Sequence, residues 1–434
     1  MKPLLIRDGQ LFDPGQGINE PWSLLIKDGV ISWLGETRMM PPETDCDIIS
    51  ARGLFVVPGF IDLHCHFREP GFEEKETIAT GAQAAANGGF TTVCCMPNTL
   101  PPLDNRESVE FVLAKAAKEA VVRVLPVGCI TRGRQGEELV DMADLASAGV
   151  VGFSDDGDSV ANADLMRRAL ESSHILGLPV IEHCEDKALS GRGILNEGIV
   201  SARLGLKGIP PAAEENVVAR DLELARLTGG RVHIAHVSTS GSVGLIRHAK
   251  REGIAVTAEV TPHHLTLTEE EVVAHGTNAK VNPPLRTSRD IEALVDALND
   301  GTIDVIATDH APHTVAEKAL RLEEAPFGII GLETAFGSLM GLVNSGQVSI
   351  DTLITRLTSA PASILGERFG RLGTLTVGAP ADVVLVDLAK EWVVDPDTFA
   401  SKGRNTPLAG RTLKGKVMAT ISRGKIVYKD DSLA

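Results

Sequence analysis

The sequence predicts an α/β protein: a (β/α)8 barrel of the TIM type, with a small β-sandwich domain formed by both chain termini. Through the middle of the chain, short apolar runs typical of strands alternate with segments whose apolar residues recur at helical spacing. Eight such runs can be counted, which is the number a closed parallel barrel requires. Hairpin patterns recur at both ends. A doubly wound open sheet is the second architecture that this alternation allows.

The two ends of the chain carry pairs of short apolar runs separated by Asp-Gly or Arg-Gly turns, a pattern typical of β-hairpins. The expected pairs are 4–6 with 11–12, 24–26 with 30–31, and 417–422 with 426–428, next to a further strand at 383–386. Neither end has enough strands to bury two sheet faces alone. We therefore expect residues 1–54 and 367–434 to form one composite sandwich, with the barrel occupying residues 55–366.

The middle of the chain supplies the barrel elements. The expected strands are residues 60–66, 91–96, 123–128, 150–154, 180–183, 232–237, 255–260 and 305–308. The expected helices are residues 73–87, 105–120, 164–176, 214–227, 240–251 and 287–298. Several helix patterns run into glycine before the next strand, as at Gly88 and Gly229, which suits a helix C-cap.

Composition narrows the class of protein. The 434 residues include 43% hydrophobic residues, enough for a sizeable core, and the net charge is -16. Such acidity argues against nucleic acid or an anionic membrane as a partner, because both need a basic face. The sequence shows neither a signal-like start nor an apolar run of about 20 residues. We expect a cytoplasmic protein whose six cysteines, which lack CxxC spacing, are reduced and structural.

Candidate functional residues gather at the predicted strand ends. His64 and His66 are two apart in a strand, so their imidazoles share one side and can converge on a metal ion, while Cys65 points away. Residues able to bind metal also end later strands, and in a barrel all these ends meet at one mouth. They are Asp155 and Asp156 after the fourth strand, Glu182, His183 and Glu185 at the fifth, His236 at the sixth, and Asp309 and His310 at the eighth.

The residue types indicate hydrolytic metal chemistry. Neutral imidazole and carboxylate ligands suit zinc, and an open zinc site lowers the pKa of bound water to about 7. A carboxylate bridging two ions would make a shared hydroxide the nucleophile. A further carboxylate is then needed as a proton shuttle, and Asp309 fits that role.

Seven motifs together resemble class I bacterial dihydroorotases of the amidohydrolase superfamily. They are GFIDLHCHFREPG at 59–71, MPNT at 96–99, DDG at 155–157, HCE at 183–185, HVST at 236–239, NPPLR at 282–286 and TDHAPH at 308–313. The likeness runs from the first hairpin to Tyr428. It implies reversible, zinc-dependent hydrolysis of (S)-dihydroorotate to N-carbamoyl-L-aspartate in pyrimidine (UMP) biosynthesis. It also implies a homodimer, and allows a complex with aspartate transcarbamoylase.

The resemblance also implies roles for single residues. One metal ion would be held by His64, His66 and Asp309 and a second by His183 and His236, with Asp156 bridging, so that one or two zinc ions are expected. The residues implied to contact substrate are His66, Arg68, Asn98, Asn282, His313, Phe327 and Gly328. A guanidinium fork suits the substrate carboxylate, which favours Arg68 over a mere salt bridge with Glu69. Residues 315–327 are expected to form a charged loop that covers the substrate.

Two alternatives remain open on the sequence. Hydantoinases, dihydropyrimidinases and allantoinases share the fold, but carry a carboxylated lysine on strand four, where this chain has Ser154. Hydantoinases also use a tyrosine, and the one tyrosine here is Tyr428. A non-catalytic, dihydroorotase-like scaffold for aspartate transcarbamoylase would have lost metal ligands, whereas every expected ligand is present.

Overall fold

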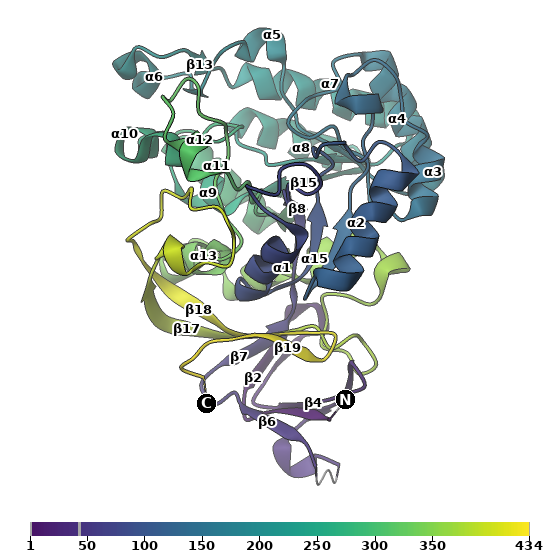
Figure 1. Cartoon of the computed structure of the whole chain (residues 1–434), viewed down its shortest axis with the longest axis vertical. Helices are drawn as coiled ribbons and strands as arrows, with labels where there is room; N and C mark the ends of the chain where they lie inside the picture. Colours follow the sequence, from purple (N-terminus) through teal and green to yellow (C-terminus); the bar gives the residue numbers. More distant parts are fainter. Residues whose placement is uncertain (1, 42–44, 434) are drawn as a thin grey trace.

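The computed structural model describes residues 2–41 and 45–433. Figure 1 shows a barrel surrounded by helices above a smaller all-β part, and both marked chain ends lie in that lower part. Within the described residues, no helix combines the length and the apolar character needed to cross a membrane. The six cysteines are free, and five of them are buried, as the spacing predicts.

The lower part consists of two sheets that share an apolar core. One sheet has the order β5-β4-β1-β6 and the other β19-β18-β17-β7-β2-β3. The first contains Leu4–Arg7 (β1), Ser23–Lys27 (β4), Val30–Gly35 (β5) and Asp47–Ser50 (β6). The second contains Gln10–Asp13 (β2), Ile18–Glu20 (β3), Phe55–Pro58 (β7), Val383–Val393 (β17), Thr412–Ser422 (β18) and Lys425–Lys429 (β19). Residues of both chain ends, such as Ile6, Leu11 and Val383, are buried together between the sheets.

Two of the three predicted hairpins are confirmed: β4 pairs antiparallel with β5, and β18 with β19. The predicted hairpin of residues 4–6 with 11–12 is wrong. The turn at Asp8 carries the chain from one sheet to the other, so β1 pairs with β4 and β6 while β2 pairs with β3 and β7. Alternating polarity specifies which face of a strand is buried, but it does not specify which strand lies beside it.

The barrel strands form a closed ring. Its regular strands are Phe60–Cys65 (β8), Phe90–Cys95 (β9), Arg123–Pro126 (β10), Val180–Glu182 (β11), Val232–Ile234 (β14), Val256–Val260 (β15) and Val305–Ile306 (β16). The pairs are parallel, with orders β10-β9-β8 and β11-β14-β15-β16. Isolated bridges close the gaps, from Gly128 to Phe153, from Phe153 to Val180, and from Cys65 to His310.

The fourth predicted strand, at residues 150–154, is the one exception among the eight. It is the least regular strand, with bridges at Phe153 alone, yet it lies where it was predicted. The Val151 and Ser154 N–H groups donate to the Pro126 and Gly128 carbonyls at 3.0 and 2.8 Å, and on the other side the Phe153 N–H donates to the Pro179 carbonyl at 3.0 Å. After Ser154 the chain turns, and the Asp155 carboxylate accepts hydrogen bonds from the Ile130 and Thr131 N–H groups at 2.9 and 3.1 Å.

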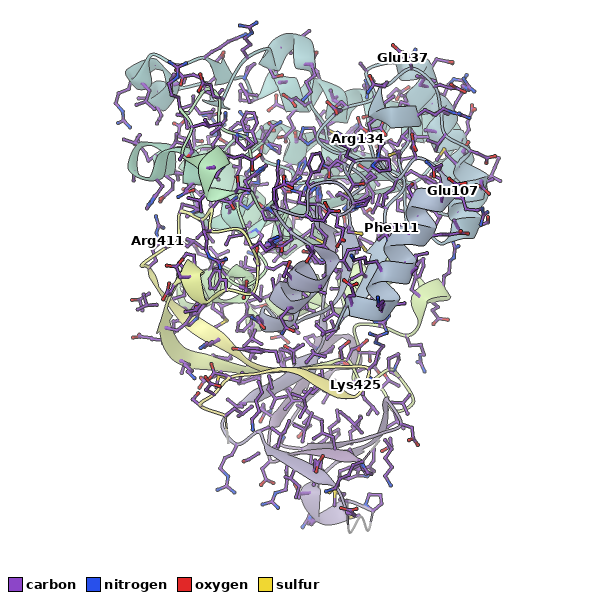
Figure 2. All side chains as sticks on the ribbon, viewed as in Figure 1. Glu107, Phe111, Arg134, Glu137, Arg411 and Lys425 are labelled. Atoms are coloured by element: carbon purple, nitrogen blue, oxygen red, sulfur yellow. The ribbon has the colours of Figure 1, made fainter. Side chains whose placement is uncertain are left out.

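Helices cover the outside of the ring. The main ones are Ile78–Asn87 (α1), Arg106–Glu119 (α2), Met142–Ala148 (α3), Ala163–Leu176 (α4), Ala212–Thr228 (α7), Ser240–Arg251 (α8), Ser288–Asp300 (α11), Ala335–Asn344 (α13), Ile350–Leu357 (α14) and Ser359–Leu365 (α15). The first is shorter than predicted, because Thr77 forms a capping box with Thr80 and starts the helix there. Figure 2 shows Glu107 and Phe111 of α2 on the outer flank.

Short elements decorate the barrel. They are Lys187–Ser190 (α5), Leu195–Asn196 (β12), Ile199–Leu204 (α6), Gly208–Ile209 (β13), Pro262–Thr266 (α9), Glu271–His275 (α10) and Val315–Lys318 (α12). Short 3-10 turns add Pro14–Gln16, Thr37–Met39, Arg132–Arg134, Gly276–Ala279, Glu367–Phe369 and Pro396–Thr398. The predicted loop 315–327 therefore begins with a helical turn.

One junction connects the two parts directly. The sandwich strand β7 ends at Pro58 and the barrel strand β8 begins at Phe60, so that only Gly59 separates them. A Cβ atom at Gly59 would lie 2.1–2.8 Å from the side chain of Thr91, which explains the glycine. The Gly59 N–H donates to the Asp382 carbonyl at 2.8 Å, immediately before β17.

Candidate metal and substrate site

The first group of candidate ligands lies where β8 ends. His66 Nε2 lies 3.0 Å from Asp309 Oδ1 and 3.5 Å from Asp156 Oδ2, and His64 Nε2 lies 3.3 Å from Asp156 Oδ1. His64 Nε2 is also 3.7 Å from Asp309 Oδ1. The period-two geometry of a strand thus brings both imidazoles to one place, where two carboxylates from distant segments meet them.

The second group comes from the strands on the other side of the ring. His183 follows β11 and His236 follows β14, and His183 Nδ1 lies 2.9 Å from His236 Nε2. Asp156 Oδ1 lies 3.6 Å from His236 Nε2 and 3.9 Å from His183 Nδ1. Asp156 therefore belongs to both groups. Two sets of three possible ligand atoms each lie within 4.8 Å of one another, one from His64, His66 and Asp156 and the other from Asp156, His183 and His236, and these five residues are buried.

The arrangement fits a divalent cation. His64 Nε2 and Asp156 Oδ1 are buried and lack a hydrogen-bond partner among the described residues. Orphaned buried acceptors are costly unless a cation or water satisfies them. Imidazole nitrogens mixed with carboxylate oxygens are the donor set of zinc and related ions. A thiolate does not contribute, since the Sγ of Cys184 contacts the Glu182 carbonyl instead.

The carboxyls of the site are held in the form that binds metal. Burial opposes ionisation of Asp156, but His64, His236 and His66 outweigh it and hold the pKa of this carboxyl well below its ordinary range. Burial likewise opposes ionisation of Asp309, and the hydrogen bond with His66 and the nearby imidazoles hold its pKa low. Burial lowers the pKa of His66 and favours its neutral form, whereas the carboxylates of Glu259 and Asp156 outweigh burial and raise the pKa of His64, and the hydrogen bond with Asp156 raises that of His236. Metal ligands need ionised carboxyls and neutral imidazoles, so a bound cation would take the place of the protons on these two rings.

Backbone strain accompanies these side chains. His236, Asp309 and Arg68 are non-glycine residues with positive φ angles, of 33°, 46° and 61°. Residues in this region cost about 1–3 kcal/mol each and cluster at functional sites, where surrounding structure enforces them. The turns after the strands therefore aim these side chains at the cavity at some cost in stability.

A buried glutamate supports the imidazoles from below, and the sequence reasoning missed it. Glu259 on β15 accepts from His64 Nδ1 at 2.6 Å through Oε1 and from His233 Nε2 at 3.1 Å through Oε2. It also accepts from the His236 backbone N–H at 3.2 Å. Carboxylate–histidine pairs of this kind fix the tautomer and orientation of a metal-binding imidazole. The available signal was a glutamate inside an otherwise apolar strand, Val256–Val260.

A second glutamate, Glu185, was predicted only as one of the polar residues at the strand ends, and the structure shows that it connects the two halves of the site. Its Oε2 lies 3.2 Å from His183 Nε2 and accepts from Asn282 Nδ2 at 3.0 Å and from Lys187 Nζ at 2.5 Å. Glu185 thus orients a candidate metal ligand and the predicted substrate residue Asn282 together. Arg134, labelled in Figure 2, donates a hydrogen bond of 2.7 Å to the backbone carbonyl of Asp156.

The predicted substrate residues lie around the same space. Asn98 Oδ1 is 2.9 Å from His66 Nδ1, and Arg68 donates to the Pro312 carbonyl at 3.3 Å beside His313. Glu69 does not hold Arg68, because it pairs with Lys115 and accepts from the Ile78 N–H. A cavity of about 270 Å³ brings the predicted residues together; it is lined by His66, Arg68, Asn98, Asp156, His183, His236, Asn282, Asp309, His313, Phe327 and Gly328. His64 lies beneath them, fully buried.

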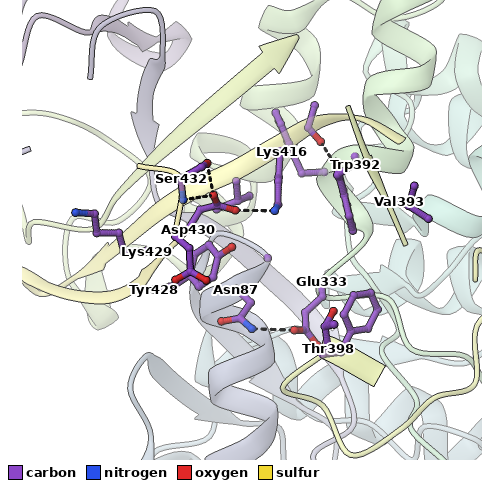
Figure 3. A pocket seen from close by; sticks show the side chains of 17 residues that line it. Asn87, Glu333, Trp392, Val393, Thr398, Lys416, Tyr428, Lys429, Asp430 and Ser432 are labelled. Atoms are coloured by element: carbon purple, nitrogen blue, oxygen red, sulfur yellow. Dashed lines mark hydrogen bonds and ion pairs between the residues drawn. The ribbon is translucent and has the colours of Figure 1, made fainter. Parts of the chain in front are cut away.

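A larger cavity lies elsewhere in the chain. It measures about 540 Å³ and lies between α13 and the C-terminal strands, with Trp392, Lys416 and Tyr428 on its walls (Figure 3). Figure 3 also shows Glu333 bonded to Asn87 at its base. None of the candidate metal ligands lines it. The chemistry therefore belongs to the smaller cavity at the barrel mouth.

Comparisons with known proteins bear on both the fold and the family. Residues 53–242 match the family described as Dihydro-orotase-like, and residues 212–428 match the Amidohydrolase family. Curated dihydroorotases from Thermoanaerobacter sp. and Pelotomaculum thermopropionicum are 51% and 53% identical over 429 and 428 residues. These alignments cover 99% and 98% of this chain, and 98% and 99% of the relatives.

Solved structures of similar fold carry other names. The L-hydantoinase from Arthrobacter aurescens has a TM-score of 0.89 at 25% identity, and the alignment covers 100% of this chain and 98% of that one. The dihydropyrimidinase from Brevibacillus agri has a TM-score of 0.84 at 22% identity, with 100% and 96% covered. The second likeness shows the fold alone. Together with the ring of parallel strands, these neighbours confirm the predicted barrel with a β-sandwich.

Proposed function

Because this chain belongs to the dihydroorotase family of the amidohydrolase superfamily, we propose that the residues gathered at its barrel mouth hydrolyse the ring amide of (S)-dihydroorotate. The chain is a cyclic amide hydrolase, a dihydroorotase of pyrimidine biosynthesis, as the resemblance of its motifs predicts. One observation carries the assignment of the site. Two pairs of histidines, His64 with His66 and His183 with His236, lie around the shared Asp156 at the barrel-mouth cavity.

The family is metal-dependent, and the side chains present fit such an ion. We propose zinc, held by His64, His66 and Asp309 at one position and by His183 and His236 at a second, with Asp156 between them. When bound, zinc would polarise the scissile carbonyl and lower the pKa of the attacking water. The mixed nitrogen and oxygen donor set supports zinc over magnesium or calcium, which prefer oxygen ligands alone.

Asp309 is the proposed proton shuttle. Its carboxyl is ionised in the resting site because His66 and the other imidazoles hold its pKa low, so it can accept a proton. We assign it the proton that water loses as its oxygen bonds to the ring carbonyl carbon. Asp309 then gives this proton to the ring nitrogen as the C–N bond breaks, and the ureide of N-carbamoyl-L-aspartate leaves with that hydrogen.

Substrate orientation falls to the polar groups around the cavity. The Arg68 guanidinium, near Asn98 and His313, suits the substrate carboxylate. Asn282 and the backbone at Phe327 and Gly328 are placed for the amide groups of the ring. Arg68 is the most specific of these assignments, because a fixed guanidinium can bind a carboxylate through two parallel hydrogen bonds.

Two features favour dihydroorotase activity over that of the hydantoinases with similar folds. Ser154 stands in the fourth barrel strand where those enzymes are expected to carry a bridging lysine, and Asp156 is available in its place. Tyr428 lies on β19 at the sandwich, beside the large cavity of Figure 3, and does not line the barrel-mouth cavity. A tyrosine that polarises the scissile carbonyl is therefore not available among the cavity-lining residues.

The experiment is ring opening by the purified, zinc-loaded chain, with dihydroorotate, hydantoin and allantoin as parallel substrates. We expect turnover of dihydroorotate, at least 100-fold slower turnover of the other two, and loss of activity in Asp309→Asn. A folded, zinc-loaded chain that opens none of the three rings would favour the non-catalytic scaffold instead. Restoration of turnover by added aspartate transcarbamoylase would show that the complex is the active form.

We also propose the organisation around this site. Because β7 belongs to the sandwich sheet, the division between sandwich and barrel is placed after Pro58, four residues beyond the 1–54 limit expected from the sequence, with the C-terminal sandwich segment still at 367–434. We propose that the chain acts as a homodimer in the cytoplasm and that it can bind aspartate transcarbamoylase. Light scattering of the chain alone and mixed with a transcarbamoylase tests both associations.

A further inference from the structure

The turn at residues 326–328 lines the barrel-mouth cavity, and the protein itself occupies nearly all of its backbone polar groups. The Phe327 carbonyl lies 2.8 Å from His313 Nε2, and the Gly328 N–H donates to the Lys280 carbonyl at 2.9 Å. The Pro326 and Gly328 carbonyls accept from Lys318 Nζ at 3.0 and 2.9 Å. The Phe327 N–H has no partner among the described residues. One donor of this turn therefore stays free beside the cavity.

Two buried lysines hold the segment in this shape. Lys318 is 7% exposed, and Lys280, 2% exposed, donates through Nζ to the Leu322 and Ala325 carbonyls at 2.7 and 2.6 Å. The Lys280 ammonium also lies 4.4 Å from the centre of the Phe327 ring. Within the described residues neither ammonium has a carboxylate within ion-pair distance. Both ammonium groups therefore donate their hydrogen bonds to backbone carbonyls of residues 322–328.

Burying two ammonium groups near each other is expensive. Burial and the charge of Lys280 lower the pKa of Lys318 to about 7, and burial also lowers the pKa of Lys280. In an exposed loop, water would satisfy these carbonyls and no buried lysine would be needed. Gly328 shows why this turn must keep a fixed conformation. Its φ is +126°, and a Cβ atom there would lie 2.7 Å from the Ala311 Cβ, so the turn is wedged against the segment that follows Asp309.

We propose that Lys318 and Lys280 are positioning residues of the substrate site, which fix residues 326–328 so that the Phe327 N–H donates to a ureide carbonyl of the substrate. This inference rests on the proposed function, which already assigns the Phe327 and Gly328 backbone to the ring amides, and it adds the two lysines that fix that backbone. Arg68 is assigned to the carboxylate. The lysines, through the turn, distinguish a ligand that carries a ureide from a simple carboxylate.

The test compares Lys318→Met with Lys75→Met as a matched control. Lys75 forms an ion pair at 2.7 Å with Glu317, the residue next to Lys318 on helix α12, and has no hydrogen bond to residues 326–328. In zinc-loaded Lys318→Met we expect the KM for dihydroorotate to rise about tenfold, with kcat within about twofold and zinc content unchanged, the loss of one well-placed hydrogen bond. Inhibition by succinate, which has carboxylates and no ureide, should stay within twofold. Lys75→Met should change none of these values.

Lys318→Gln guards against a misfolded methionine variant, because its amide keeps donor hydrogens at a shorter reach; it should show an intermediate KM. An unchanged KM in both variants, or a parallel loss of succinate inhibition, overturns the positioning role. A wild-type chain without dihydroorotate turnover would instead refute the proposed function. Calorimetric binding of N-carbamoyl-L-aspartate, which carries a ureide, to wild type and Lys318→Met would then still test the role of the lysine, with unchanged affinity overturning it.

Discussion

Glu259 offers the sharpest test of how this site is built, because it does not line the cavity and yet bonds to two candidate metal ligands, His64 and His236. In Glu259→Gln the side-chain shape is retained, and the carbonyl oxygen can still accept from His64 Nδ1. The amide nitrogen then faces His233 Nε2, which can lose its hydrogen because His233 Nδ1 has Thr257 Oγ1 as a partner at 2.8 Å. The substitution thus removes a charge and weakens two hydrogen bonds while leaving the packing intact.

The size of the effect follows from those bonds. A hydrogen bond to a charged group contributes about 1.5–3 kcal/mol, against about 1 kcal/mol for a neutral one. The bond between His64 and Glu259, at 2.6 Å, is the one that orients a candidate ligand. If this bond is weakened by roughly 1–2 kcal/mol, zinc binding should weaken about 10-fold. This lies within the roughly 10- to 100-fold range typical of substitutions at residues that hydrogen-bond to metal ligands. Glu259→Leu removes every acceptor and should lose zinc and stability together.

Zinc affinity is measured by equilibrium competition with a chromophoric chelator, and kcat is measured separately at saturating zinc. Glu333→Gln is the matched control, since this partly buried carboxylate accepts from Asn87 and from the Ala400 and Ser401 N–H groups and does not touch the candidate metal ligands. Glu259→Gln protein with wild-type zinc affinity would refute the reasoning. Equal losses in both variants would show a general effect of removing a buried charge.

Three further substitutions test separate parts of the site. Asp309→Asn should retain most of the zinc and lower kcat by about 10²- to 10⁴-fold, the usual contribution of a proton-transfer group; activity above a tenth of wild type would exclude the shuttle. Arg68→Met should raise the KM for dihydroorotate about 10- to 100-fold with unchanged zinc content, and an equal effect on hydantoin, which lacks the carboxylate, would contradict it. Gly328→Ala should cost about 1–3 kcal/mol of stability, seen as a lower thermal midpoint, because alanine resists a φ of +126° and its Cβ meets Ala311; an unchanged midpoint would mean that the turn relaxes freely.

Much of the fold follows from local patterns. Elements with strong periodicity, such as β8 and α8, lie within one residue of their predicted limits, and the β18–β19 hairpin has its predicted turn, although β18 begins at Thr412 and not at 417. The first hairpin was predicted wrongly, because it depends on a partner strand that the local sequence does not specify, and β2 joins the sheet of β7. The fourth barrel strand lies where it was predicted, although only Phe153 forms regular bridges.

The candidate site divides in the same way. Residues at strand ends, such as His64 and Asp309, could be proposed from the sequence because the barrel topology brings such ends together. Glu259 could not, because its role depends on β15 lying between the strands of His64 and His233. Lys318 was hidden in a run that reads as a charged surface loop, and only the fold reveals that its ammonium turns inward.

Because only Gly59 separates β7 from β8, the two strands form one nearly continuous extended segment that runs from the sandwich into the barrel. Its lower half is clamped in a sheet between β17 and β2, and its upper half ends in the paired imidazoles. The sandwich therefore helps to fix the position of the histidines at the end of β8. A barrel cut free of it would keep every ligand in its sequence but would let His64 and His66 drift, so shortened versions of this enzyme should lose their metal before they lose their shape.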